Sequence, residues 1–139
     1  MPEKSRNREQ RLIAKGRARI LGTGNFLTSE ELTTRFPNES TLSRAVLEAW
    51  EEEHRIFSIK HDGQVLYPSY AFSSDGEVLS GLKDVIVVLN SRMDGWRLAL
   101  WFGSSNSFLG GAQPCEGLCS NPDSVISAAV NEAQGAQHG

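Results

Sequence analysis

The side chains that could do chemistry in this chain are few and widely spaced. His61 stands beside Asp62, and Ser58 and Ser69 lie nearby in the sequence, which together suggest a nucleophilic hydrolase. The same Asp62 begins an Asp-Gly pair, the common signature of a tight hairpin turn. Neither a third orienting group nor an oxyanion site can be argued for around them. We therefore expect no catalytic residues and a protein that is not an enzyme.

Metal and cofactor chemistry has equally little support. Cys115 and Cys119 are the two cysteines, and their spacing would place them one turn apart on one helix face, unlike the pairs of zinc or redox motifs. Residues 51–54, Glu-Glu-Glu-His, cannot converge on one ion, because consecutive helix positions point in different directions. Residues 22–24, Gly-Thr-Gly, lack the preceding strand and the lysine of a nucleotide-binding loop. We expect buried or partly buried free thiols, no metal site and no cofactor.

Charge is distributed unevenly along the chain. Residues 1–19 hold seven Lys and Arg and two Glu, a net charge of +5, and since the whole chain carries −3, the remainder carries −8. A basic arm of this kind is typical of segments that contact nucleic-acid phosphates, and also of a solvated terminus. We predict that residues 1–24 form a basic N-terminal arm, helical over 5–21, which needs a partner surface to be ordered.

The pattern of residues 25–76 is that of a winged helix-turn-helix. Thr28 and Glu31 form a capping box that starts a helix reaching Phe36, and residues 38–41 predict the start of a second helix running to Glu53. β-Branched and aromatic residues on both sides of the Asp-Gly turn predict a hairpin over 55–68, followed by an extended connection. A helix-turn-helix followed at once by a hairpin is the order of a winged DNA-binding domain.

DNA contact is the chemistry that this order favours. In a helix-turn-helix the first residues of the second helix reach base edges, while residues around them hold phosphates. The sequence therefore predicts a DNA-binding set made of Arg35, Ser40, Thr41, Ser43, Arg44, Lys60 and His61. Four glutamates at positions 48 and 51–53 would repel a DNA backbone, so a winged fold kept as a protein-binding scaffold is the alternative interpretation.

Residues 77–133 predict a small helical domain. The apolar spacing over 79–90 fits a helix, although Val85–Val88 alone would favour a strand. Gly103 is placed to end the next helix, and Pro114 is placed to open the one after it. We predict helices over 79–90, 96–102, 114–119 and 121–133, and a disordered tail over 134–139. The aromatic residues from Trp96 to Phe108 are expected to serve packing.

Two parts of the chain resemble known protein families. The run from Trp101-Phe102 through Leu109-Gly110-Gly111 to Ala128-Ala129, with Asn106, Pro114, Leu118 and Val125 between, resembles the Xre/MbcA/ParS-like antitoxin toxin-binding domain over residues 78–133. Residues 25–72 resemble the excisionase or MerR-type winged helix. The resemblance implies a helical antitoxin that forms a homodimer, binds its own promoter DNA and blocks a RES-domain toxin that degrades NAD. Cys115 and Cys119 stand where aliphatic residues are usual in the family.

The resemblance also implies where a partner protein would bind. Carried over by position, the framework of the antitoxin domain would comprise Trp101, Leu109, Gly110, Pro114 and Leu118, and the last helix would approach the toxin. We take residues 114–133 as the candidate interface. The predicted partner-binding residues are Pro114, Leu118, Val125, Ala129, Asn131 and Glu132. The alternative is a stand-alone protein-interaction module with neither DNA binding nor a cognate toxin.

Composition sets the remaining expectations. The apolar share of 39% and the charged share of 22% are ordinary for globular proteins. No apolar run is long enough to span a bilayer, and the first residues lack the apolar core of a signal peptide. We therefore expect a cytoplasmic protein without membrane contact. Its expected fold is mostly α with a small β-hairpin: a winged helix-turn-helix followed by a small helical domain, with the two parts sharing a core.

Overall fold

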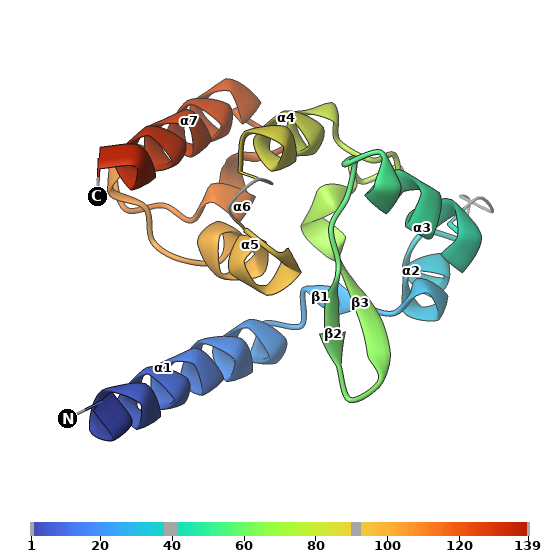
Figure 1. Ribbon diagram of the computed structural model, residues 1–139. Helices are drawn as coiled ribbons and strands as arrows, with labels where there is room; N and C mark the ends of the chain where they lie inside the picture. Colours follow the sequence, from blue (N-terminus) through green and yellow to red (C-terminus); the bar gives the residue numbers. More distant parts are fainter. Residues whose placement is uncertain (1, 38–41, 90–92, 139) are drawn as a thin grey trace.

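The computed structural model describes residues 2–37, 42–89 and 93–138. Over these residues the chain is mostly helical with one small antiparallel sheet, which confirms the predicted fold class (Figure 1). The helices are α1 Pro2–Gly22, α2 Ser29–Arg35, α3 Arg44–Glu52, α4 Ser80–Leu89, α5 Gly95–Phe102, α6 Pro114–Gly117 and α7 Pro122–His138. The strands are β1 Phe26–Leu27, β2 Ile59–His61 and β3 Gln64–Pro68, and two 3-10 turns are η1 Ser69–Ala71 and η2 Ser107–Leu109.

A hairpin is present over 59–68, which is shorter than the predicted 55–68 because β2 begins only at Ile59, and we call residues 59–68 the wing. β2 and β3 are joined at Asp62 and Gly63, whose φ angles of 50° and 76° are both positive, as a type I′ turn requires. A third strand, β1, pairs antiparallel with β3 and gives the sheet order β1-β3-β2. The sequence did not indicate β1, because two residues are too few to show an alternating pattern. After β3, the 3-10 turn η1 takes the place of the predicted extended connection over residues 69–71, and the backbone is extended again at Phe72.

Both helices of the helix-turn-helix form, but the second begins later than predicted. The capping box of α2 is confirmed, since the Glu31 N–H donates to Thr28 Oγ1 and the Thr28 N–H donates to the Glu31 carboxylate. Ser43 caps α3 by accepting the Val46 N–H at 3.3 Å, so the predicted start at 38–41 is wrong, and those four residues lie outside the described part of the chain. Leu42 before this cap and Leu47 in α3 are both buried, as in a hydrophobic staple.

The C-terminal half consists of α4 to α7, in which α4 packs along α7 (Figure 1). The helix predicted over 79–90 is confirmed over 80–89, and its buried face points toward α7 and the core. α7 continues to His138, so the disordered tail predicted over 134–139 is wrong for residues 134–138. Nothing in Ala-Gln-Gly-Ala-Gln forces a helix to stop, because a single internal glycine weakens a helix without breaking it.

One aromatic cluster joins the winged half to the C-terminal half. The Phe57 and Phe102 rings are stacked, with centroids 5.7 Å apart and planes 7° from parallel. Tyr70 packs on the same Phe102 ring at 5.7 Å. These residues belong to a single core that contains buried side chains from both halves, as expected of two parts that share a core.

The N-terminal helix α1 is attached to α5 by its C-terminal end (Figure 1). The Arg19 guanidinium donates to the Gly103 carbonyl oxygen at 2.6 Å and to Ser104 Oγ at 3.1 Å, and Ile20 is buried. Two residues before Arg19, the Arg17 guanidinium lies over the Trp96 ring, 4.9 Å from its centroid. Residues 7–15 are exposed along the outer part of the helix. Among the helices of the described residues, none combines the length and the apolar character needed to cross a membrane.

Candidate functional site

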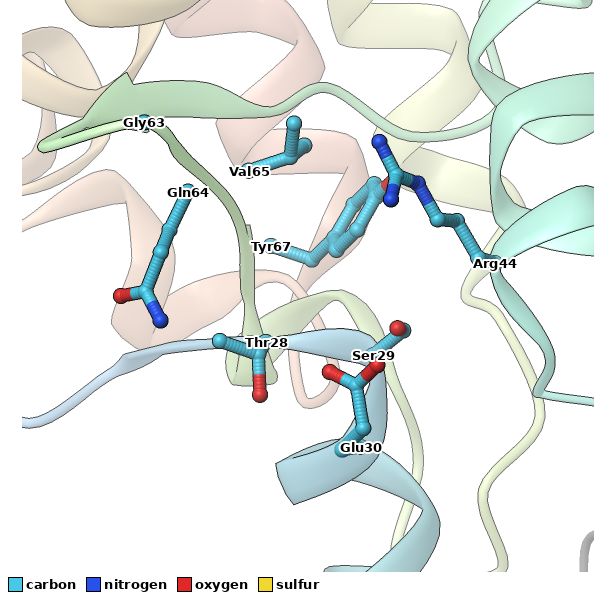
Figure 2. A pocket seen from close by; sticks show the side chains of 8 residues that line it. All are labelled: Thr28, Ser29, Glu30, Arg44, Gly63, Gln64, Val65 and Tyr67. Atoms are coloured by element: carbon cyan, nitrogen blue, oxygen red, sulfur yellow. The ribbon is translucent and has the colours of Figure 1, made fainter.

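A hollow opens where the wing meets the first turns of α2 and α3. Three separate segments line it, and we call it the wing hollow (Figure 2): Thr28, Ser29, Glu30, Arg44, Gly63, Gln64, Val65 and Tyr67. Its volume of about 150 Å³ is below the roughly 300 to 1,000 Å³ of pockets that enclose small ligands. The wing hollow therefore suits an edge of a larger molecule better than a cofactor.

Arg44 is the cation of the wing hollow. It is the first residue of α3, and its guanidinium extends over the hollow (Figure 2). Arg44 Nε lies 3.1 Å from Glu48 Oε1, one turn further along the helix. Both side chains are well exposed, at 69% and 59%. Because such an exposed pair contributes at most about 1 kcal/mol to stability, its main effect is to orient the guanidinium.

Glu30 brings a carboxylate to the same hollow from the first turn of α2. The backbone N–H of Glu30 lowers the pKa of its carboxyl, and the Ser29 and Thr28 hydroxyls and the charge of Arg44 act in the same direction. The side chain is fully solvated, so at neutral pH it is an ionised hydrogen-bond acceptor. The wing hollow thus presents donors and acceptors from opposite elements.

Tyr67 forms the buried floor of the wing hollow. Its side chain is 1% exposed, and its hydroxyl has no hydrogen-bond partner among the residues that the structure describes. Burial raises the pKa of the Tyr67 phenol, and the charges of Glu51 and Glu48 on α3 add to the increase. The phenol is therefore neutral at physiological pH.

The structure does not bring the predicted DNA-binding residues together at one site. Arg44 lies in the wing hollow, whereas Arg35 lines a separate hollow with Phe36, Pro37, Ser74 and Asp75. The Ser43 hydroxyl is committed to capping α3, and Ser40 and Thr41 lie outside the described residues. Lys60 and His61 are exposed on the wing. The structure therefore supports a different use for Ser43 from the base contact that we had predicted.

The wing is held in place by its neighbours. The Trp96 indole N–H donates to the Lys60 carbonyl oxygen at 3.2 Å, which ties β2 to α5. His61 Nε2 lies 3.3 Å from the Asp62 carboxylate, an ion pair only when the histidine is protonated. Lys60 is exposed, and its cross-strand partner Val65 lines the wing hollow.

Sequence reasoning missed four polar residues of the wing hollow, namely Thr28, Ser29, Glu30 and Gln64. The first three were interpreted only as a helix start, and Gln64 only as a strand residue after the turn. The sequence predicts the two helix starts and the hairpin separately, and no local pattern indicates that they meet at one hollow.

The predicted partner interface requires a correction. Pro114 is buried, and Leu118, Val125 and Ala129 are 2%, 1% and 0% exposed, so these four residues belong to the core and not to a surface. They fill the space between α6, α7 and the helices packed on them. Asn131 is exposed and Glu132 half-buried, so these two remain available.

Phe108 is an exposed aromatic side chain of the C-terminal half. It was expected to pack, yet it is 51% exposed on η2. Asn106 Oδ1 accepts the Phe108 N–H at 2.9 Å, and Asn106 exchanges backbone hydrogen bonds with Ala112 and Gly111. Gly110 and Gly111 have φ angles of 68° and 95°, which only glycine adopts readily. These hydrogen bonds and turns define the backbone of the loop that carries Phe108.

The two cysteines have different environments. α6 ends at Gly117, so Cys115 and Cys119 do not share one regular helix face as predicted. Cys115 is half-buried, and burial raises the pKa of its thiol to about 11. Cys119 is exposed, which corrects the expectation that it is buried. The described ranges contain no group of three or more residues able to hold a metal ion.

The wing hollow and the Phe108 loop are two surface features on different halves of the chain. One combines Arg44, Glu30 and the wing, and the other presents an apolar ring from the opposite half. Comparison of the chain with protein-family models, with curated proteins and with solved structures finds no match.

Proposed function

We propose that this chain is a cytoplasmic, antitoxin-like regulator that binds DNA through its winged half and a partner protein through its C-terminal half. The main support for DNA binding is the position of Arg44. Its guanidinium stands at the first turn of the second helix of a helix-turn-helix, over a hollow that the wing also lines. That is the position from which helix-turn-helix proteins reach base edges in the major groove.

Charge around the wing hollow is compatible with this proposal. Lys60 and His61 are exposed on the wing, and in the proposed complex they would contact phosphates beside the groove. The exposed outer part of α1 adds further cations, from Arg8 to Lys15. Since phosphate contacts release counterions, binding should weaken steeply as salt rises.

The experiment is a titration of fluorescently labelled duplex from the chain's own upstream region, measured by anisotropy at low salt. Arg44→Ala should lower the affinity about 5-fold to 150-fold, the range for loss of one bidentate base contact. Lys83→Ala, which removes an exposed cation from α4, is the matched control and should leave the affinity within about 2-fold. Equal affinities for Arg44→Ala and the unmodified chain would contradict the DNA part.

The protein-binding part is supported by Phe108. An exposed aromatic ring on a hydrogen-bonded loop loses little conformational freedom on binding, which is why aromatic residues are frequent at interface centres. The resemblance to the antitoxin family implies a RES-domain toxin as the partner and a homodimer as the binding form. If the chain does not bind DNA, the exposed Phe108 ring favours the second candidate function, a protein-interaction module.

Coexpression with a RES-domain toxin from the same genome tests the protein-binding part. The unmodified chain should preserve cellular NAD and co-purify with the toxin, and Phe108→Ala should lower the affinity of the complex at least 10-fold. Leu12→Ala, which truncates an equally exposed apolar residue on α1, is the matched control and should bind normally. Full neutralisation by Phe108→Ala would remove that loop from the proposed interface.

A further inference from the structure

The wing hollow contains a feature that general DNA affinity does not require: the carboxylate of Glu30. A negative charge there weakens the attraction for phosphates, so a surface built only to hold a DNA backbone would be stronger without it. We infer that Arg44 and Glu30 together recognise one G·C base pair, in which Arg44 contacts guanine and Glu30 contacts cytosine. This inference rests on the proposed DNA binding.

The chemistry of the base edges matches these two side chains. In the major groove guanine presents two adjacent acceptors, O6 and N7, and cytosine presents the N4 amino donor. Arginine donates to the first pair and an ionised carboxylate accepts from the second. An A·T pair presents no two adjacent acceptors on one base, so the guanidinium fork of Arg44 has no equivalent partner there.

The geometry of the wing hollow brings the two groups to one place. Arg44 reaches it from α3 and Glu30 from α2, and the charge of Arg44 acts on the Glu30 carboxyl (Figure 2). A donor group and an acceptor group facing one small hollow correspond to the two halves of one base pair. Gln64 and Gly63 of the wing close the remaining side.

Glu48 is the positioning residue in this assignment. Its carboxylate accepts the Nε–H of Arg44 at 3.1 Å, so this contact does not occupy the two terminal nitrogens, Nη1 and Nη2. A guanidinium fixed in this way meets guanine O6 and N7 with less loss of side-chain freedom. Glu48 therefore acts on base preference through Arg44, without touching DNA.

The test is selection of bound duplexes from a random-sequence pool by the full chain, followed by sequencing. The unmodified chain should enrich a G·C pair at one position by about 10-fold to 100-fold over the other pairs. Glu30→Gln should reduce that enrichment severalfold while total DNA affinity stays equal or rises, because a repulsive charge is lost. Glu48→Gln should weaken the preference for G·C at the same position, and Arg44→Ala should abolish it.

Glu52→Gln is the matched control, since it removes one exposed acid from the far end of α3 and should leave the base preference unchanged. Unaltered G·C enrichment in Glu30→Gln would overturn the inference, as would enrichment of A·T or of no pair in the unmodified chain. Failure of the unmodified chain to bind any duplex would instead overturn the proposed function. All four variants change exposed residues and should keep the unfolding midpoint of the unmodified chain, which excludes misfolding as the cause.

Discussion

At the residue scale, hydrogen bonds decide which side chains a ligand can reach. Ser43 and Arg44 are adjacent, yet the first spends its hydroxyl on capping α3, whereas the second offers two terminal nitrogens to the wing hollow. The sequence could not separate these roles, because the start of α3 depends on the burial of Leu42 and Leu47. Several Ser, Thr and Asn residues in a row would each make an acceptable cap.

The two cysteines provide a test at this scale. The thiolate is the form that reacts with alkylating agents, and burial holds the pKa of Cys115 near 11 against an ordinary value of 9.0. At pH 8 iodoacetamide should therefore label Cys119 rapidly and Cys115 roughly 100-fold more slowly, with the Cys115 rate rising as pH approaches 11. Peptide mass mapping gives both rates. In the Cys119→Ser variant rapid labelling should disappear, and equal rates in the unmodified chain would refute the difference in burial.

The raised pKa of Cys115 also makes the stability of the fold depend on pH. The folded state favours the neutral Cys115 thiol, so its stabilising effect is complete below pH 9 and is lost as pH rises from 9 toward 11.

At the element scale, the sequence correctly predicted the features that depend only on neighbouring residues. The capping box of α2 and the Asp-Gly turn of the wing form among neighbouring residues, and both are present as predicted. β1 and η1 were missed because β1 exists only through pairing with β3, and η1 follows directly from the end of that strand. Pairing between distant segments leaves no periodic signal in a stretch of two or three residues.

Gly95 marks the closest approach between the winged half and α5. A Cβ at this position would overlap the Ser58 carbonyl oxygen, a backbone atom that cannot move aside. Gly95→Ala should therefore lower the free energy of unfolding by about 1 to 3 kcal/mol, as overpacking usually does. Urea denaturation should show this as a lower midpoint. Gly22→Ala, at the end of α1 with no atom within 4 Å of the added Cβ, is the control and should be neutral or slightly stabilising.

At the scale of the whole molecule, one core serves both halves. Phe57 from the winged half stacks on Phe102 from α5, and Tyr70 packs beside them. The sequence indicated the helices of the C-terminal half but not which apolar residues face inward. Val125 and Ala129 were predicted at an interface because an apolar stripe that packs on the chain's own helices looks the same as one that binds a partner.

A shared core predicts a single cooperative transition. Phe102→Ala should lower the free energy of unfolding by about 3 to 5 kcal/mol, the usual cost of deleting a buried phenylalanine ring. Hydrogen exchange should then accelerate together in β3 and α7, which belong to different halves. Phe108→Ala removes the same ring from an exposed site and should cost less than about 1 kcal/mol. Exchange that accelerates only in the C-terminal half would show that the two halves unfold separately.

The stack of Phe57 on Phe102 also bears on the lifetime of the protein in a cell. Proteases act on unfolded segments, so a chain whose halves unfold together exposes both to degradation in the same event. The proposed DNA-binding and partner-binding activities would then share one half-life. A partner that binds the folded C-terminal half slows the loss of the winged half as well, because it stabilises the folded chain as a unit.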